Sequence, residues 1–131
     1  MKLDELKELQ VDGCVHRKDF PYVVVYPNEW DKPMIRNTQG EFFCDRHSIL
    51  EYNDNEMLFY EDYEICLVPS GPNIMGNYYY LHPIKPKNIT YLYHTRKQMI
   101  DLITHLRDNR RYYEKQRMVK EKLINLENDF K

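Results

Sequence analysis

Residues 95–106 read TRKQMIDLITHL. Thr95 and Gln98 have the spacing of a capping box, in which the threonine accepts a hydrogen bond from a free backbone N–H and the glutamine reaches back. A helix is therefore expected to begin at this point. Its first half carries an apolar stripe wide enough to pack on a sheet, formed by Met99, Leu102, Ile103 and Leu106.

The sequence that follows, RDNRRYYEKQRMVKEKLINLENDFK at residues 107–131, changes this pattern. The apolar residues disappear around Arg107 to Arg111 and return at spacings of four, three and four, as in a coiled-coil seam, with Val119, Leu123, Leu126 and Phe130. Two such repeats are too few to hold a helix pair together alone. We expect this half to pack on the same chain or on another molecule, and a homodimer through the C-terminal helix is one prediction. The pattern does not decide between one helix and two.

Strand patterns lie upstream of the helix. Residues 22–26, Tyr-Val-Val-Val-Tyr, are β-branched and aromatic and stand between Pro21 and Pro27, which predicts a buried strand. Further strands are predicted at residues 57–60, 63–68, 77–81 and 89–93, and a short amphipathic helix at residues 2–10. The expected fold class is α+β: a small, mainly antiparallel sheet of about five strands with a short N-terminal helix and a long C-terminal helix.

The length of 131 residues suits a single domain, residues 1–131, with one compact core. Much of the hydrophobic fraction of 42% lies in 12 Tyr and 5 Phe, so many rings are expected at the core boundary or on a contact surface. Three cysteines and no hydrophobic leader favour a reducing, cytoplasmic compartment. The apolar stretches are far shorter than the ~20 residues of a membrane helix, so no membrane association is expected.

The sequence contains no alanine and is rich in Asn, Lys, Tyr and Ile, a composition typical of AT-rich coding sequences. Bacteriophages, low-GC bacteria and some intracellular parasites share this composition. A phage-encoded protein is one prediction.

Charge is divided unevenly along the chain, although the formal net charge is only −2. Residues 1–94 carry nine Lys/Arg and fifteen Asp/Glu, whereas residues 95–131 carry ten and six. The two parts are expected to attract different partners, because an acidic face concentrates cationic proteins and a basic helix concentrates phosphate backbones.

The acidic segment between positions 51 and 64 is the first candidate site. Its carboxylates could stand where phosphates normally lie, with aromatic side chains between them as desolvated anchors. This hypothesis predicts a nucleic-acid mimic that docks on a basic protein, such as host nucleic-acid machinery, through Glu51, Tyr52, Asp54, Glu56, Phe59, Tyr60, Glu61, Asp62, Tyr63 and Glu64. The alternative is an ordinary solvated surface.

The C-terminal helix supplies the second candidate, a nucleic-acid-binding accessory factor that uses Arg107, Arg110, Arg111, Lys115 and Arg117. These cations alternate with acidic residues. The alternation also fits a solvent-exposed helix stabilised by neighbouring opposite charges.

The arrangement closest to a metal site consists of Cys14, His16, Cys44 and His47, because thiolate and imidazole groups are zinc ligands. Cys-x-His with Cys-x2-His departs from the common zinc spacings, so we prefer ordinary cysteines with no metal and no cofactor. No nucleophile elbow, Walker loop or glycine-rich dinucleotide motif occurs. The sequence therefore predicts a non-enzymatic protein-binding inhibitor or adaptor, with the nucleic-acid-binding factor and a small zinc protein or enzyme as alternatives.

Overall fold

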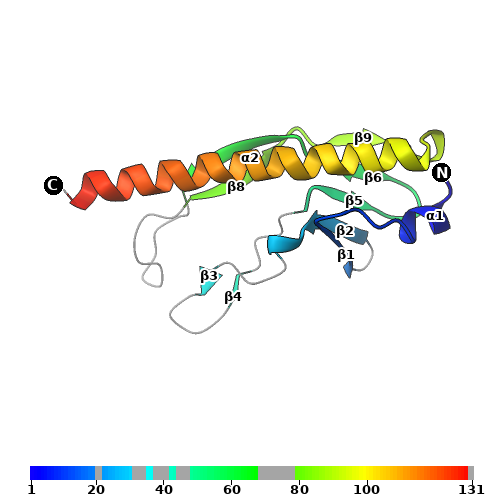
Figure 1. The fold of residues 1–131 in the computed structure, drawn as a ribbon, viewed down its shortest axis with the longest axis horizontal. Coiled ribbons are helices and arrows are strands. Elements are labelled where there is room, and N and C mark those ends of the chain that lie inside the picture. Colours follow the sequence, from blue (N-terminus) through cyan, green and yellow to red (C-terminus); the bar gives the residue numbers. More distant parts are fainter. Residues whose placement is uncertain (20–21, 31–34, 37–41, 44–47, 68–78, 130–131) are drawn as a thin grey trace.

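A computed structural model describes residues 1–19, 22–30, 35–36, 42–43, 48–67 and 79–129. Its centre is an antiparallel sheet of five strands in the order β1-β2-β5-β6-β9 (Figure 1). These strands are β1 (Cys14–Asp19), β2 (Tyr22–Pro27), β5 (Leu50–Tyr52), β6 (Met57–Phe59) and β9 (Lys87–Ile89).

Two smaller antiparallel pairs accompany this sheet: β3 (Ile35–Arg36) with β4 (Phe42–Phe43), and β7 (Asp62–Leu67) with β8 (Tyr79–Ile84). The helices are α1 (Leu3–Lys7), the short 3-10 turns η1 (Asn28–Trp30) and η2 (Tyr91–Tyr93), and α2 (Arg96–Asp129). In Figure 1, α2 runs the length of the molecule alongside β8 and β9, and its C-terminal end projects past β1, β2 and β5.

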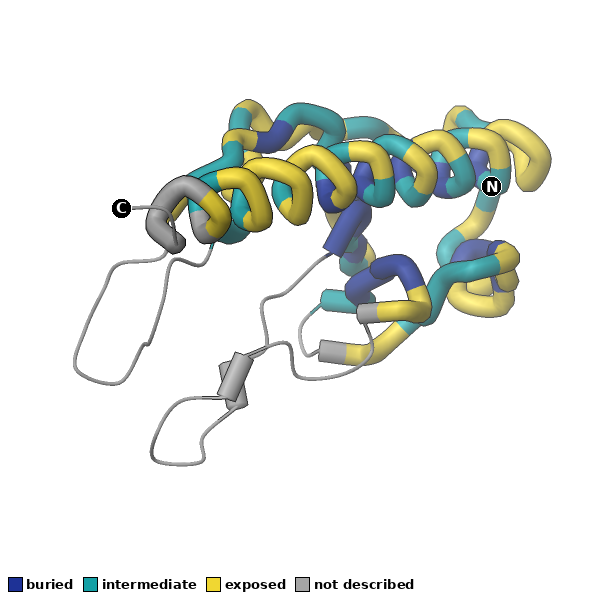
Figure 2. Tube along the Cα trace, turned by 60° about the vertical axis from the view of Figure 1, so that its left-hand side comes forward, coloured by how far each residue is buried: buried dark blue, intermediate teal, exposed yellow. Residues whose placement is uncertain are grey.

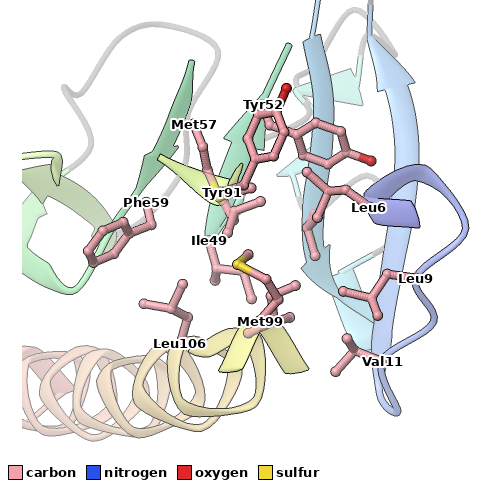
Figure 3. Packing of buried hydrophobic residues seen from close by; sticks show 13 residues of the cluster. Leu6, Leu9, Val11, Ile49, Tyr52, Met57, Phe59, Tyr91, Met99 and Leu106 are labelled. Carbon is pink, nitrogen blue, oxygen red and sulfur yellow. The ribbon is translucent and has the colours of Figure 1, made fainter. Parts of the chain in front are cut away.

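The core lies between one face of the central sheet and the two helices (Figure 3). Strand side chains alternate between the two faces. In β5 and β6, the residues that point into the core are therefore Leu50 and Tyr52, paired across the strands with Phe59 and Met57. The helical and N-terminal segments contribute Leu6, Leu9, Val11, Met99, Ile103 and Leu106, all buried.

The fold class expected from the sequence is confirmed: a short N-terminal helix, a mainly antiparallel sheet and a long C-terminal helix. The capping box is also confirmed, because the Thr95 N–H donates to Gln98 Oε1 at 2.8 Å and the Gln98 N–H donates to Thr95 Oγ1 at 3.1 Å. Residues 96–129 form one continuous helix, which answers the question that the pattern left open.

Other local expectations are corrected by the structure. The segment 89–93 does not form the predicted strand: β9 ends at Ile89, and residues 91–93 form η2. Tyr91 is buried there and its hydroxyl donates to the Asp54 carbonyl at 3.2 Å, so tertiary contacts override the strand propensity of the tyrosines. Strands β1, β3 and β5 were not predicted.

Candidate protein-binding surface

Helix α2 has two sides along its 34 residues, because residues three or four positions apart share one side of a helix. The side toward the strands holds fully buried Met99, Ile103 and Leu106 in its first half, and buried Arg110 and Glu114 in its middle. The opposite side faces away from the strands and differs between the two halves of the helix.

In its first half, the outward side of α2 is polar, with exposed Asp101 and Asp108. In its second half, the same side is apolar. The exposed fractions there are 60% for Tyr112, 57% for Val119, 57% for Leu123 and 45% for Leu126. We name these four residues the α2 stripe. Figure 2 shows that exposed residues continue along α2 toward its C-terminal end.

The α2 stripe has the spacing of a coiled-coil seam. Tyr112, Val119 and Leu126 follow one another at intervals of seven, and Leu123 lies between the last two. Side chains at this spacing insert as knobs between the side chains of a second helix. Gln116, seven positions before Leu123, is the polar member of the seam. The stripe therefore has the geometry of a helix-binding surface.

The edges of the stripe are basic. Lys115 and Lys122 are exposed, lie seven residues apart on one edge, and form no ion pair or hydrogen bond within the described part of the chain. On the other edge, the ammonium of Lys120 lies 5.3 Å from the centroid of the Tyr79 ring. An acidic surface would complement these edges.

The inward side of the same half is held to β8 by polar bonds. Arg117 bonds Glu114 at 2.5 Å and Glu121 at 2.8 Å, and donates to the Tyr79 carbonyl at 3.2 Å. Glu121 accepts from the Tyr79 N–H at 3.0 Å. Burial alone would lower the pKa of Arg117, but its bonds to the two glutamates outweigh burial and raise it. The apolar residues of the stripe take no part in this attachment.

Three of the aromatic residues predicted to be interface anchors lie in the interior. The exposed fractions are 1% for Tyr52, 7% for Phe59 and 6% for Tyr63. The Tyr63 ring packs edge-to-face on the Tyr113 ring, with 5.3 Å between the two centroids. The Arg110 guanidinium lies 4.5 Å from the centroid of the Tyr63 ring. These three rings are therefore not accessible as anchors for a partner, because alternation turns every second residue of a strand inward.

Half of the predicted acidic residues have partners within the chain. Three carboxylates accept a hydrogen bond from another side chain: Glu51 from Ser48 at 2.8 Å, Glu56 from Tyr22 at 3.1 Å and Glu61 from Lys87 at 2.8 Å. Asp54 and Glu64 are exposed, and Asp62 is half-buried. Tyr60 is half-buried as well, and burial, reinforced by Glu51, raises its pKa to about 12.

These carboxylates do not share one continuous face. Glu51 alternates with the inward Leu50 and Tyr52 and therefore lies on the sheet face away from α2. Glu61 lies on the helix side instead, 3.8 Å from the His105 imidazole. The acidic segment is thus divided between two sides of the molecule.

Four of the five cations predicted to bind nucleic acid are engaged within the chain. Arg107 pairs with Asp108 at 3.0 Å and also donates to the Asp12 carbonyl, and Arg111 pairs with Glu29 at 2.6 Å. Arg110 is only 2% exposed, and Arg117 bonds two glutamates. Lys115 alone is exposed and without such a partner among the described residues, so little free charge is left to neutralise phosphates.

Only half of the zinc arrangement can be placed, because Cys44 and His47 lie outside the described residues. Cys14 and His16 are both half-buried on β1. Burial raises the pKa of the Cys14 thiol to about 11, although Arg107 and Arg111 act in the opposite direction, so a thiol rather than a thiolate is favoured. Among the residues that the structure describes, no three metal-ligating side chains come together.

The sequence pattern identified three members of the stripe but missed Tyr112. Its interval of seven from Val119 was the available signal, and it was hidden because the polar Gln116 stands between them.

No protein-family model, curated protein or solved structure matches this chain. None of the helices in the described ranges combines the length and apolar character needed to cross a membrane.

Proposed function

We propose that the protein is a non-enzymatic adaptor or inhibitor that binds another protein through the α2 stripe. One observation carries this proposal: four large apolar side chains, each 45% to 60% exposed, form a line on the side of α2 opposite its own sheet. Contiguous exposed apolar residues rimmed by polar groups are typical of protein interaction sites.

The partner that fits this surface best is an amphipathic helix with acidic flanks. Seam spacing matches an apolar helix face that offers knobs and holes of the same period. Lys115 and Lys122 along one edge would pair with carboxylates of the partner, which speeds association and fixes orientation. Gln116 would select a partner with a polar residue opposite it, because a buried amide needs a hydrogen bond.

A partner docked on the acidic segment receives less support. Its anchors Tyr52, Phe59 and Tyr63 are buried, and charged groups without desolvated apolar anchors contribute more to association rate than to affinity. The α2 stripe offers such anchors.

The experiment combines affinity capture with amine cross-linking in a lysate of the cells that express the protein. Lys115 and Lys122 flank the stripe, so cross-links from these two lysines to one protein are the expected result. Leu123→Glu places a charge in the stripe and should abolish capture and cross-links. Leu92→Glu is the matched control, because Leu92 is 59% exposed and lies outside the stripe, and it should retain the partner.

Purified partner and protein are then titrated by calorimetry, so that direct binding is measured. Equal affinity of the wild type and Leu123→Glu for the partner would contradict the proposal. Sedimentation equilibrium of the protein alone tests for a homodimer. A dimer that Leu123→Glu dissociates would show that the stripe binds a second copy of this chain, which would overturn the proposal of a different partner protein.

A further inference from the structure

A pocket of about 260 Å³ lies between α1 and one end of the central sheet. Helix α1 contributes Leu3 and Lys7 to its lining, β1 contributes Lys18, and β2 contributes Val23. The remaining lining residues are Tyr22 on β2 and Tyr52, Asn53 and Asp54 at and after the end of β5. The volume is slightly below the roughly 300–1,000 Å³ of drug-sized sites, which suits a fragment-sized ligand. We name it the α1 pocket.

The strand register explains why these side chains meet. Lys18 pairs with Val23 across β1 and β2, and Val23 pairs with Tyr52 across β2 and β5. Residues opposite one another in adjacent strands point to the same face of a sheet. The lysine, the valine and the tyrosine therefore form one row, and α1 lies over the end of this row with Leu3. The apolar part of the pocket comes from Leu3 and Val23.

Two positive charges at the pocket have no partner among the described residues. Neither Lys7 nor Lys18 forms an ion pair or hydrogen bond with any residue that the structure describes. Asp54, exposed at the same pocket, offsets one of these charges, so one net positive charge remains. A monoanion would neutralise this charge, whereas a dianion would leave one negative charge uncompensated at the site, so a monoanion fits better.

Further hydrogen-bond donors line the same wall. The Tyr52 hydroxyl makes no hydrogen bond within the described ranges, although the residue is only 1% exposed. Burial raises its pKa to about 12, so the group remains a hydroxyl that can donate. Asn53 uses its Oδ1 to accept from the N–H groups of Asn55 and Glu56, both at 2.9 Å, which leaves its amide NH₂ to donate.

We infer that the α1 pocket binds a small organic carboxylate, with its apolar body against Leu3 and Val23 and its carboxylate held by Lys7 and Lys18. Charge-assisted hydrogen bonds from ammonium groups are the strong contacts in such a site, and the Tyr52 hydroxyl adds a neutral donor. This ligand site is separate from the α2 stripe, so the two can be tested independently.

The test is a titration of the ¹⁵N-labelled protein with sodium benzoate, followed by amide chemical shifts. Saturable shifts at Lys18, Val23 and Asn53 at millimolar benzoate are expected. Benzyl alcohol, which has the ring without the charge, should produce no saturable shift at these amides, and equal binding of benzyl alcohol would refute the role of the lysines. Phenyl phosphate is the dianionic probe, and tighter binding of phenyl phosphate would overturn the carboxylate assignment.

Variants separate a specific site from general attraction of anions. Lys18→Met removes the charge but keeps most of the stem, and it should weaken benzoate binding about tenfold, as expected for one charge-assisted hydrogen bond. Lys97→Met is the matched control, because Lys97 is exposed on α2 and not among the pocket residues, and it should leave the affinity unchanged. Tyr52→Phe should weaken benzoate binding by a smaller factor, while its amide spectrum remains that of a folded protein. An unchanged affinity in Lys18→Met would overturn the inference.

Discussion

The His16 imidazole has both ring nitrogens buried, and neither has a hydrogen-bond partner in the part of the chain that the structure describes. A buried polar group without a partner costs free energy, and a charged one costs considerably more. Burial accordingly lowers the pKa of His16 below its ordinary value of 6.5. The folded protein therefore holds this histidine neutral, whereas the unfolded chain protonates it at the ordinary pKa.

Stability should consequently decrease as the pH falls below 6.5, because the unfolded state then binds more protons than the folded state. Urea unfolding midpoints measured between about pH 7 and about pH 5 test this expectation. In His16→Leu, the decrease should be smaller, and the unfolding free energy at neutral pH should be equal to or above that of the wild type. Glu29, whose pKa Arg111 lowers, loses its contribution only as the pH falls through values below 4.5, outside this window.

The matched control is the same substitution at His82, which is exposed on β8. This variant should keep the pH dependence of the wild type. If His16→Leu and His82→Leu had identical slopes between these pH values, the burial of His16 would have no part in the pH dependence.

At the scale of the element, α2 depends on a single start signal. Thr95 and Gln98 satisfy each other's backbone N–H groups, whereas Thr90, the residue before η2, makes no side-chain capping bond. Thr95→Ala should therefore lower the unfolding free energy by about 1 kcal/mol. Thr90→Ala should change it by less than about 0.5 kcal/mol. Chemical denaturation of both variants measures the difference, and equal losses would show that the capping bonds contribute nothing measurable.

Elements encoded by local signals were predicted well from the sequence. The capping box placed the start of α2, and the β-branched run at residues 22–26 placed β2 within one residue of its observed end. The strands β1 and β5 lack such runs, and each is ordered by pairing with β2 rather than by a pattern of its own. Pairing with a neighbouring strand leaves no periodic signature in the sequence of the paired segment, which is why these two strands were missed.

How well each candidate site could be predicted also depended on whether local sequence spacing or long-range strand pairing places its residues. The acidic segment was treated as one surface, but alternation in β5 and β6 and the passage from β6 to β7 divide its residues between interior and two exposed sides. The stripe was easier to predict, because helix α2 continues without interruption and sequence spacing alone fixes which residues share a side.

At the scale of the whole molecule, the two sides of α2 have separate roles in the proposed function: the inward side stabilises the fold, and the outward side binds the partner. Its inward side completes the core with Ile103 and Leu106, while its outward side presents the stripe on a part of the helix that projects past the central sheet (Figure 1). A side chain that contributes to the core loses transfer free energy and leaves a cavity when truncated. Truncating a side chain that is already half-exposed removes little transfer free energy and leaves almost no cavity.

Truncation at matched leucines therefore tests this division. Leu106 is fully buried, so Leu106→Ala should lower the unfolding free energy by about 2–5 kcal/mol. Leu123 is 57% exposed, so Leu123→Ala should lower the unfolding free energy by less than about 0.5 kcal/mol, because no core contact is removed. Urea denaturation followed by circular dichroism gives both values at a protein concentration low enough to exclude self-association. A large loss in Leu123→Ala under those conditions would mean that the stripe packs on its own chain, and the argument for an external partner would fail with it.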